Sequence, residues 1–325
     1  MKARTIFPAL MLLSLICAIA VPARAQASNA DFQQAVAVYQ QSLTTEAAEK
    51  VIRMAVAMEQ LPPIPEEARR HFVRGTTLFK DAKSPDDYKQ VVDEFGQAAN
   101  IAPWWPDARY NRALAWEAAG NYEKAIINLK LYLLFKLPVT EARAVQDKIY
   151  ALEARQEKAE LGQELLNAIS RADSPGALAL IAKGADVNVQ YPEAAGGGSA
   201  LYQAVCNGQT DVVRAMIDKG ADVNAQVPKT GWTPLMIAVF FNRFDIARML
   251  IGSGANVNSA DINGETILMI TADSRCDAGF MQLLIDRGAS ASVNAINSHG
   301  KSALRRAIEF NRQDLAQMLR DAGAK

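Results

Sequence analysis

The sequence predicts an all-α helical repeat solenoid, in which pairs of short helices stack in chain order. Two periodicities support this prediction. In the first half, Tyr88, Val91, Phe95 and Ala98 are followed 34 residues later by Tyr122, Ala125, Leu129 and Tyr132. In the second half, a Gly-Ala pair recurs every 34 to 36 residues, at Gly184, Gly220, Gly254, Gly288 and Gly323. A period of this length is one helix–turn–helix unit, which buries its apolar face only against its neighbours.

Residues 1–25 have the pattern of a secretory signal peptide. Lys2 and Arg4 precede an apolar run, and Ala23-Arg24-Ala25 forms a small-x-small site at its end. We expect cleavage after Ala25 and a periplasmic or secreted mature protein, because the segment resembles a bacterial export signal. Two alternatives remain open, an uncleaved anchor and lipidation at Cys17. In either case the membrane would be reached only through this segment.

Residues 30–160 are expected to form a helical domain. In the unit from Pro106 to Val139, small residues at Ala113 and Ala125 allow two antiparallel helices to approach, and Gly120-Asn121 provides a turn between them. This unit resembles a tetratricopeptide repeat. A weaker unit covers about His71 to Trp105. The resemblance implies two such helix pairs.

Two further segments flank these units as amphipathic helices without the motif, Leu43 to Met58 and Glu141 to Glu157, and helical character continues to Ser170. The adjacent Trp104 and Trp105 allow two interpretations. They form either an exposed interaction site or a wedge that packs between repeats, and we favour packing for at least one of them.

Residues 161–325 are expected to form a second helical domain. A hydroxyl residue stands two positions before a leucine in each of four units, at Ser199, Thr233, Thr266 and Ser302. We predict that these hydroxyls cap the first helix of each unit, because their oxygens accept from amides that otherwise lack partners. The recurring glycines then end the second helix in the left-handed conformation.

These marks resemble the ankyrin repeat, and the stretches Gly231 to Leu235 and Gly254 to Asn258 are close to that family's pattern. The resemblance implies five units, with the outer two acting as caps. In the first unit, Gln163 and Glu164 stand at the positions expected for the helix cap.

Composition and residue spacing argue against several classes of function. Lys and Arg number 35, as do Asp and Glu, so no broad basic face for nucleic acid is expected. The chain has two histidines and three cysteines, and they are too far apart for a zinc site. No nucleophile, base and orienting group stand together. We therefore expect no catalytic residue, metal ion or cofactor, and no nucleic-acid partner.

The family resemblances imply a non-enzymatic scaffold of the bacterial envelope, which binds a protein or peptide partner on its concave repeat surfaces. Two sets of residues are implied as contacts. The first block supplies Tyr110, Asn111 and Glu117, and the second supplies Trp232, Phe240, Phe241, Glu309 and Phe310. By the same register, Asp273 and Ser274 also face the partner. The alternatives are an enzyme with an unrecognised site and a module associated with lipid or cell wall.

We expect the mature protein to begin at Gln26, because cleavage by signal peptidase follows a small-x-small site. Intact-mass measurement of the exported protein tests this prediction. A mass that retains Met1, or one that carries an added lipid, would contradict it.

Overall fold

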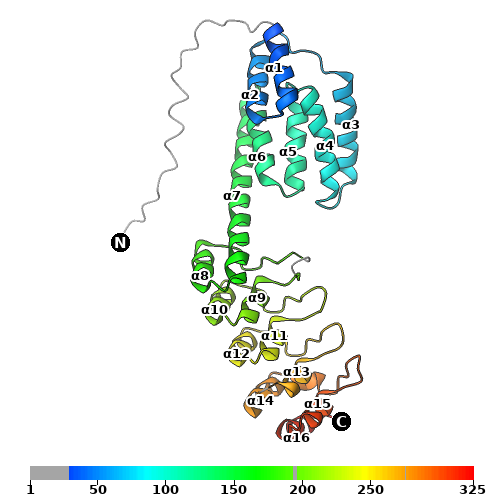
Figure 1. The fold of residues 1–325 in the computed structure, drawn as a ribbon, viewed down its shortest axis with the longest axis vertical. Coiled ribbons are helices and arrows are strands. Elements are labelled where there is room, and N and C mark those ends of the chain that lie inside the picture. The colour runs from blue at the N-terminus through cyan, green and yellow to red at the C-terminus, as the bar shows by residue number, and fades with distance from the viewer. Residues whose placement is uncertain (1–28, 193–195, 275) are drawn as a thin grey trace, which may run out of the picture. The chain divides into compact units, whose positions relative to one another are not determined.

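The computed structural model describes residues 29–192, 196–274 and 276–325, so the expected signal peptide lies outside the described residues. The chain divides into two compact units between Glu153 and Ala154. Within the described residues the regular secondary structure is helical, apart from two isolated β-bridges that close loops of the second unit (Figure 1). This agrees with the all-α prediction.

The described residues of the first unit form six helices and the beginning of a seventh. They are α1 (Asn29–Ser42), α2 (Thr45–Ala57), α3 (Glu66–Asp81), α4 (Asp87–Ile101), α5 (Pro106–Ala118), α6 (Tyr122–Tyr132) and α7 (Val139–Ser170). Helices α3 to α6 pack in chain order, and the α1–α2 pair also contacts α4 and α6. The sequence did not predict α1. The helix expected from Leu43 begins instead at Thr45, because the hydroxyl of Thr44 accepts from the amide of Ala47 and caps it.

Two predicted features of the first unit are confirmed. Gly120 has φ of 76° between α5 and α6, and the side chain of Asn121 caps α6 by accepting from the amide of Lys124 at 3.0 Å. Ala113 and Ala125 are buried, as expected for small residues where helices meet. The sequence pattern therefore located this helix pair correctly.

Both tryptophans between α4 and α5 pack inside the first unit. Trp104 is 6% exposed, its ring lies edge-on to Phe32, and its indole Nε1 donates to the carbonyl of Pro62 at 3.0 Å. Trp105 is half-buried against Phe72, with ring centroids 4.5 Å apart. The favoured interpretation, packing rather than an exposed pair, is confirmed.

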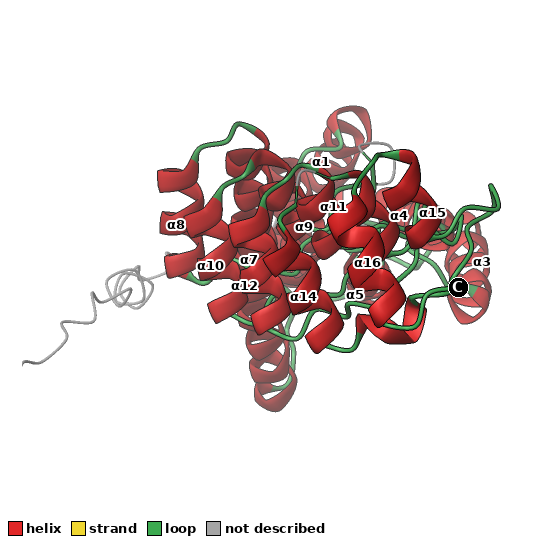
Figure 2. Ribbon diagram, turned by 90° about the horizontal axis from the view of Figure 1, so that it is seen from below, coloured by secondary structure: helices red, strands yellow, loops and turns green. Residues whose placement is uncertain are grey.

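The second unit contains the end of α7 and a series of short helices in two rows (Figures 1 and 2). The first row is α9 (Ala200–Asn207), α11 (Pro234–Phe240), α13 (Ile267–Asp273) and α15 (Ala303–Glu309). The second row is α8 (Ser174–Lys183), α10 (Thr210–Asp218), α12 (Phe244–Gly252), α14 (Ala278–Asp286) and α16 (Gln313–Asp321), with a short 3₁₀ helix η2 (Ala289–Ser292) after α14. A single apolar core runs through this unit from Leu165 to Leu319.

The first repeat differs from the others at the start of its first helix. Gln163 and Glu164 stand at the positions expected for a cap, but no helix begins there, because α7 continues through them without a break to Ser170. The helical character predicted from Glu141 to Ser170 is confirmed. The first repeat therefore uses the end of a 32-residue helix as its first helix, and Leu165 and Ile169 on that helix join the repeat core.

The predicted helix caps are confirmed in all four repeats that carry them. The hydroxyls of Ser199, Thr233, Thr266 and Ser302 each accept from the amide three residues ahead, at 3.1 to 3.4 Å. The five recurring glycines have φ between 83° and 99°, which is the left-handed region. Local chemistry therefore defines where each repeat helix begins and ends.

An asparagine four to six residues after each of the first four glycines links one repeat to the next. The side chain of Asn224 donates to the carbonyl of Gly254 at 3.2 Å and accepts from the amide of Asn256 at 2.7 Å. Asn188 bonds Gly220 and Asp222 in the same way. Equivalent bonds reach forward from Asn258 and Asn294. This ladder satisfies backbone groups at the helix ends and holds neighbouring repeats in register.

A larger side chain in the core of this unit should reduce the free energy of unfolding much more than a smaller side chain on its surface. We expect Ala238→Phe to lower the free energy of unfolding by about 1 to 3 kcal/mol or more, because Ala238 is fully buried between helices. Phe240→Ala should cost less than about 1 kcal/mol, since its ring is 55% exposed. Urea denaturation of the two variants checks this, and equal losses would show that the register of α11 is misassigned.

Candidate functional site

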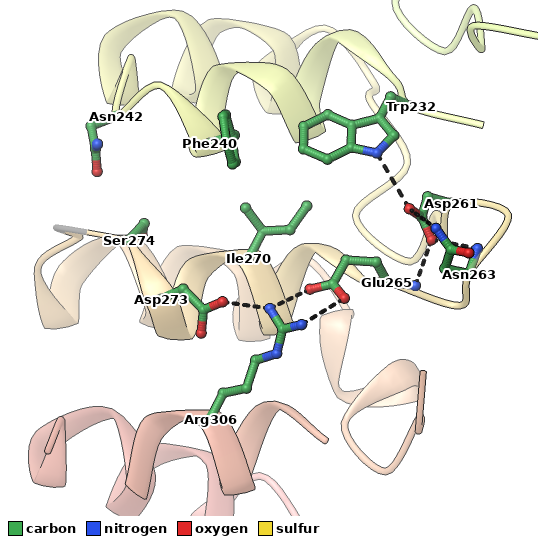
Figure 3. A pocket seen from close by; sticks show the side chains of 10 residues that line it. All are labelled: Trp232, Phe240, Asn242, Asp261, Asn263, Glu265, Ile270, Asp273, Ser274 and Arg306. Carbon is green, nitrogen blue, oxygen red and sulfur yellow. Dashed lines mark hydrogen bonds and ion pairs between the residues drawn. The ribbon is translucent and has the colours of Figure 1, made fainter. Parts of the chain in front are cut away.

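A cavity of about 500 Å³ opens on the first row of helices in the second unit (Figure 3). Three consecutive repeats line it. The repeat that contains α11 contributes an aromatic side, α13 and the loop before it contribute carboxylates and Ile270, and α15 contributes one arginine. The lining residues are Trp232, Phe240, Asn242, Asp261, Asn263, Glu265, Ile270, Asp273, Ser274 and Arg306.

The aromatic side of the cavity is formed by rings that contact one another edge to face. The centroids of Trp232 and Phe240 are 5.3 Å apart, and those of Phe240 and Phe241 are also 5.3 Å apart. Trp232 is held in place because its indole Nε1 donates to a carboxylate oxygen of Asp261 at 3.3 Å. The ring faces are thereby kept in a fixed arrangement at the rim.

The loop before α13 positions the carboxylate of Asp261. One oxygen of Asp261 accepts from the backbone amides of Asn263 and Glu265, both at 2.8 Å. The other oxygen accepts the indole N–H of Trp232. The side chain therefore joins the turn to the aromatic side of the cavity.

Arg306 lies opposite the aromatic side and binds two carboxylates of the preceding repeat (Figure 3). Its guanidinium contacts both oxygens of Glu265, at 2.6 and 2.8 Å, and also pairs with Asp273. Glu265 receives a further hydrogen bond from the side-chain amide of Asn297 at 2.9 Å. One charge-assisted hydrogen bond and one close ion-pair contact join Arg306 to Glu265, so this side of the cavity is also held in a defined geometry.

The cavity carries excess negative charge. Asp261, Glu265 and Asp273 contribute three carboxylates, and Arg306 is the one cationic side chain in the described lining. Burial raises the pKa of Asp273 above its ordinary value of 3.8; the nearby Glu265 adds to this rise, while Arg306 opposes it. A second cation at this site would relieve that cost, because opposite charge favours the ionised carboxyl.

The contact residues predicted in the second block occupy different positions around this cavity. Trp232 and Phe240 line it, and Phe241 is 47% exposed beside Phe240. Phe310 is 56% exposed after α15. Glu309 does not line the cavity. Its carboxylate instead forms ion pairs with Lys301 at 2.6 Å and Arg305 at 3.1 Å. Asp273 and Ser274, expected on the partner-facing side, are lining residues.

The contact residues predicted in the first block make contacts within their own unit. The ring of Tyr110 lies 5.0 Å from that of the buried Tyr132. Asn111 donates to the carbonyl of Asp107 in its own helix, and Glu117 pairs with Lys148 of α7 at 2.5 Å. A binding role for these three residues stays a prediction.

Sequence reasoning did not single out Asp261, Glu265 or Arg306 as site residues. Their signal is weak because Asp261 and Glu265 stand in a hairpin-like loop and Arg306 is one of two adjacent arginines. Glu265 directly precedes the capping Thr266, however, and Arg306 follows the capping Ser302 by four residues. Placing both on neighbouring repeats in register would have predicted the pair.

The part of the chain that the structure describes contains neither a metal-ligand cluster nor a membrane-spanning helix. In it, no three His, Cys, Asp or Glu side chains converge in a way that could hold a metal ion. Its helices include none that is both long and apolar enough to span a membrane.

The fold is a stack of helix pairs with a cavity on one row. Comparison with known families identifies the stack, because the family described as ankyrin repeats (3 copies) matches residues 165–261 and 253–325. The C-terminal half of this chain therefore consists of ankyrin repeats, which are typically non-catalytic and bind other proteins.

Two known proteins are similar to parts of the chain. The nuclear factor NF-kappa-B p105 subunit of Gallus gallus is 31% identical over 91 residues, which are 28% of this chain and 9% of that protein. The ankyrin repeat and KH domain-containing protein mask of Drosophila melanogaster is 40% identical over 78 residues, 23% of this chain and 2% of that protein. The chain thus spans less than a tenth of the length of either relative.

The raised pKa of Asp273 predicts a dependence of stability on pH. A carboxyl whose pKa is raised by folding stabilises the fold fully below its unfolded pKa of about 4, and this contribution is lost as pH rises through the folded pKa. Asp273→Asn cannot ionise. We therefore expect the free energy of unfolding of the variant to increase relative to that of wild type between about pH 4 and pH 7, because only wild type loses stability as the carboxyl ionises. Urea titrations at several pH values measure this difference, and a constant or opposite trend would contradict the assignment.

Proposed function

We propose that this protein is a non-enzymatic scaffold that holds a protein partner on the first row of its ankyrin repeats, with a basic side chain of the partner in the acidic cavity. The single observation that carries this proposal is the cavity itself, whose carboxylates face the aromatic rings of Trp232 and Phe240. A lysine or arginine placed there gains ionic contact on one side and a cation–π contact on the other.

Exposed apolar side chains around the cavity support a protein partner rather than a free small cation. Phe240, Phe241 and Phe310 are each about half exposed, and Ile262 and Ile308 are also exposed on the same repeats. Large exposed apolar groups around a polar pocket are typical of protein interaction sites. The apolar groups would supply contact area, while the charged cavity would select a basic residue.

The proposal also covers where the protein acts and what the first unit does. The protein would act in the bacterial envelope after export, which the pattern of residues 1–25 supports. Helices α3–α4 and α5–α6 would form tetratricopeptide-like pairs; the bounds of α5 and α6 and the left-handed Gly120 between them support this. The first unit would then offer a further binding surface.

Selection from a random peptide display library tests the proposed activity. The protein beginning at Gln26 should enrich peptides in which a lysine or arginine stands beside apolar residues. Selected peptides should lose roughly 30-fold or more in affinity for Trp232→Ala, since a buried aromatic contact is commonly worth about 2 kcal/mol or more.

The matched control is Tyr150→Ala, which removes a ring that is 57% exposed on α7 and does not line the cavity. Its peptide affinity should equal that of wild type. Enrichment of acidic peptides, or equal affinity for the Trp232 and Tyr150 variants, would refute the proposed site.

A further inference from the structure

A second cavity, in the first unit, has the opposite charge. Its volume is about 260 Å³, and it lies among α1, α2, α5 and α6. Three cationic side chains line it, Arg109, Arg112 and Lys124, and its described lining contains no carboxylate. The other lining residues include Tyr39, Thr44, Thr45, Trp116 and Asn128.

Arg109 is the most deeply buried of these cations. It is 3% exposed, and one terminal nitrogen donates to the hydroxyl of Tyr39 at 2.9 Å. Its guanidinium also lies over the Tyr39 ring, 5.5 Å from the centroid. Within the described residues, its Nε has no hydrogen-bond partner and no acidic side chain pairs with it. A buried guanidinium without a counter-charge is costly, so an anion from outside the chain would stabilise it.

Arg112 repeats this situation one helical turn further along α5. Burial lowers the pKa of Arg112, and repulsion from Arg109 lowers it further; Tyr39 and Asp93 oppose the change by smaller amounts. Its Nε is buried without a hydrogen-bond partner in the described part of the chain. Two arginines that repel one another in a shared cavity are stabilised together if one anion lies between them.

The remaining lining adds donors for an oxyanion. The ammonium of Lys124 lies 4.3 Å from the centre of the Trp116 ring. Thr44 and Thr45 form the N-terminus of the 13-residue helix α2, where free amides and the helix dipole favour negative charge. Glu46, the acidic residue of that first turn, is exposed and does not line the cavity.

The side chain of Asn128 indicates which kind of anion this cavity can bind. Its Nδ2 donates to the carbonyl of Lys124 at 2.8 Å, which leaves Oδ1 as a buried acceptor without a partner among the described residues. An acceptor beside an anion is favourable only if the anion carries a proton. Monohydrogen phosphate has one hydroxyl to donate, whereas sulfate and acetate have none at neutral pH.

We propose that this cavity binds one inorganic phosphate ion, with Arg109, Arg112 and Lys124 as its cationic contacts and Asn128 as acceptor of the phosphate hydroxyl. The site lies in the first unit and is independent of the acidic cavity in the ankyrin repeats. Bound phosphate would supply the counter-charge that the buried Arg109 and the partly buried Arg112 lack, so the stability of the first unit would depend on phosphate.

Calorimetric titration of the full mature chain with phosphate, sulfate and acetate at matched ionic strength tests the proposal. We expect one phosphate per chain, and a thermal stabilisation by phosphate that exceeds those by sulfate and acetate. Effects no larger than that of chloride would overturn the site. Equal effects of sulfate and phosphate, or tighter binding of glycerol phosphate than of free phosphate, would overturn the choice of monohydrogen phosphate.

Three variants make the test specific. Arg112→Gln should weaken phosphate binding roughly tenfold or more, because charge-assisted hydrogen bonds to the ion are lost. Lys124→Gln changes an exposed side chain on α6 and so does not endanger folding; it should weaken binding several-fold. Arg143→Gln is the matched control, an exposed residue of α7 outside the cavity, and should bind like wild type. Unchanged affinity in the Lys124 and Arg112 variants would refute the proposal.

Discussion

Burial of apolar surface between neighbouring repeats is the interaction on which the ankyrin-repeat half depends. Helices α8 to α16 have only seven to ten residues each, too few to be stable alone in water. One core joins them from Leu165 to Leu319, so each helix pair is stabilised by the pairs before and after it. The asparagine ladder then fixes the spacing that this burial requires, by bonding backbone groups of the next repeat.

Fixed spacing is also what builds the acidic cavity. Trp232, Asp261, Glu265 and Arg306 come from three repeats, and they converge because α11, α13 and α15 contact one another in order. The ion pair between Glu265 and Arg306 joins adjacent repeats, as the asparagine ladder does at the helix ends. The same repeat-to-repeat register thus serves both stability and the site.

The two cavities differ in how their charges are balanced. In the ankyrin repeats, Arg306 neutralises only part of the charge of three carboxylates, and the negative charge that is left favours binding of a cation. In the first unit, Arg109 and Arg112 form no ion pair within 4.0 Å among the described residues, and Asp93 only partly offsets the burial of Arg112, so the cavity favours an anion. Each proposal thus follows from charge that folding has buried without full compensation.

The sequence alone determined the helix pairs of the ankyrin repeats, their capping hydroxyls and left-handed glycines, and the exposed position of Phe240. These follow from local rules of backbone geometry and periodicity. Only the tertiary structure revealed that the end of α7 serves as the first helix of the first repeat and that Trp104 packs on Phe32. It alone also brought Arg306 to Glu265 and Arg109 to Tyr39. Such contacts join residues 41 and 70 positions apart, and no local pattern specifies them.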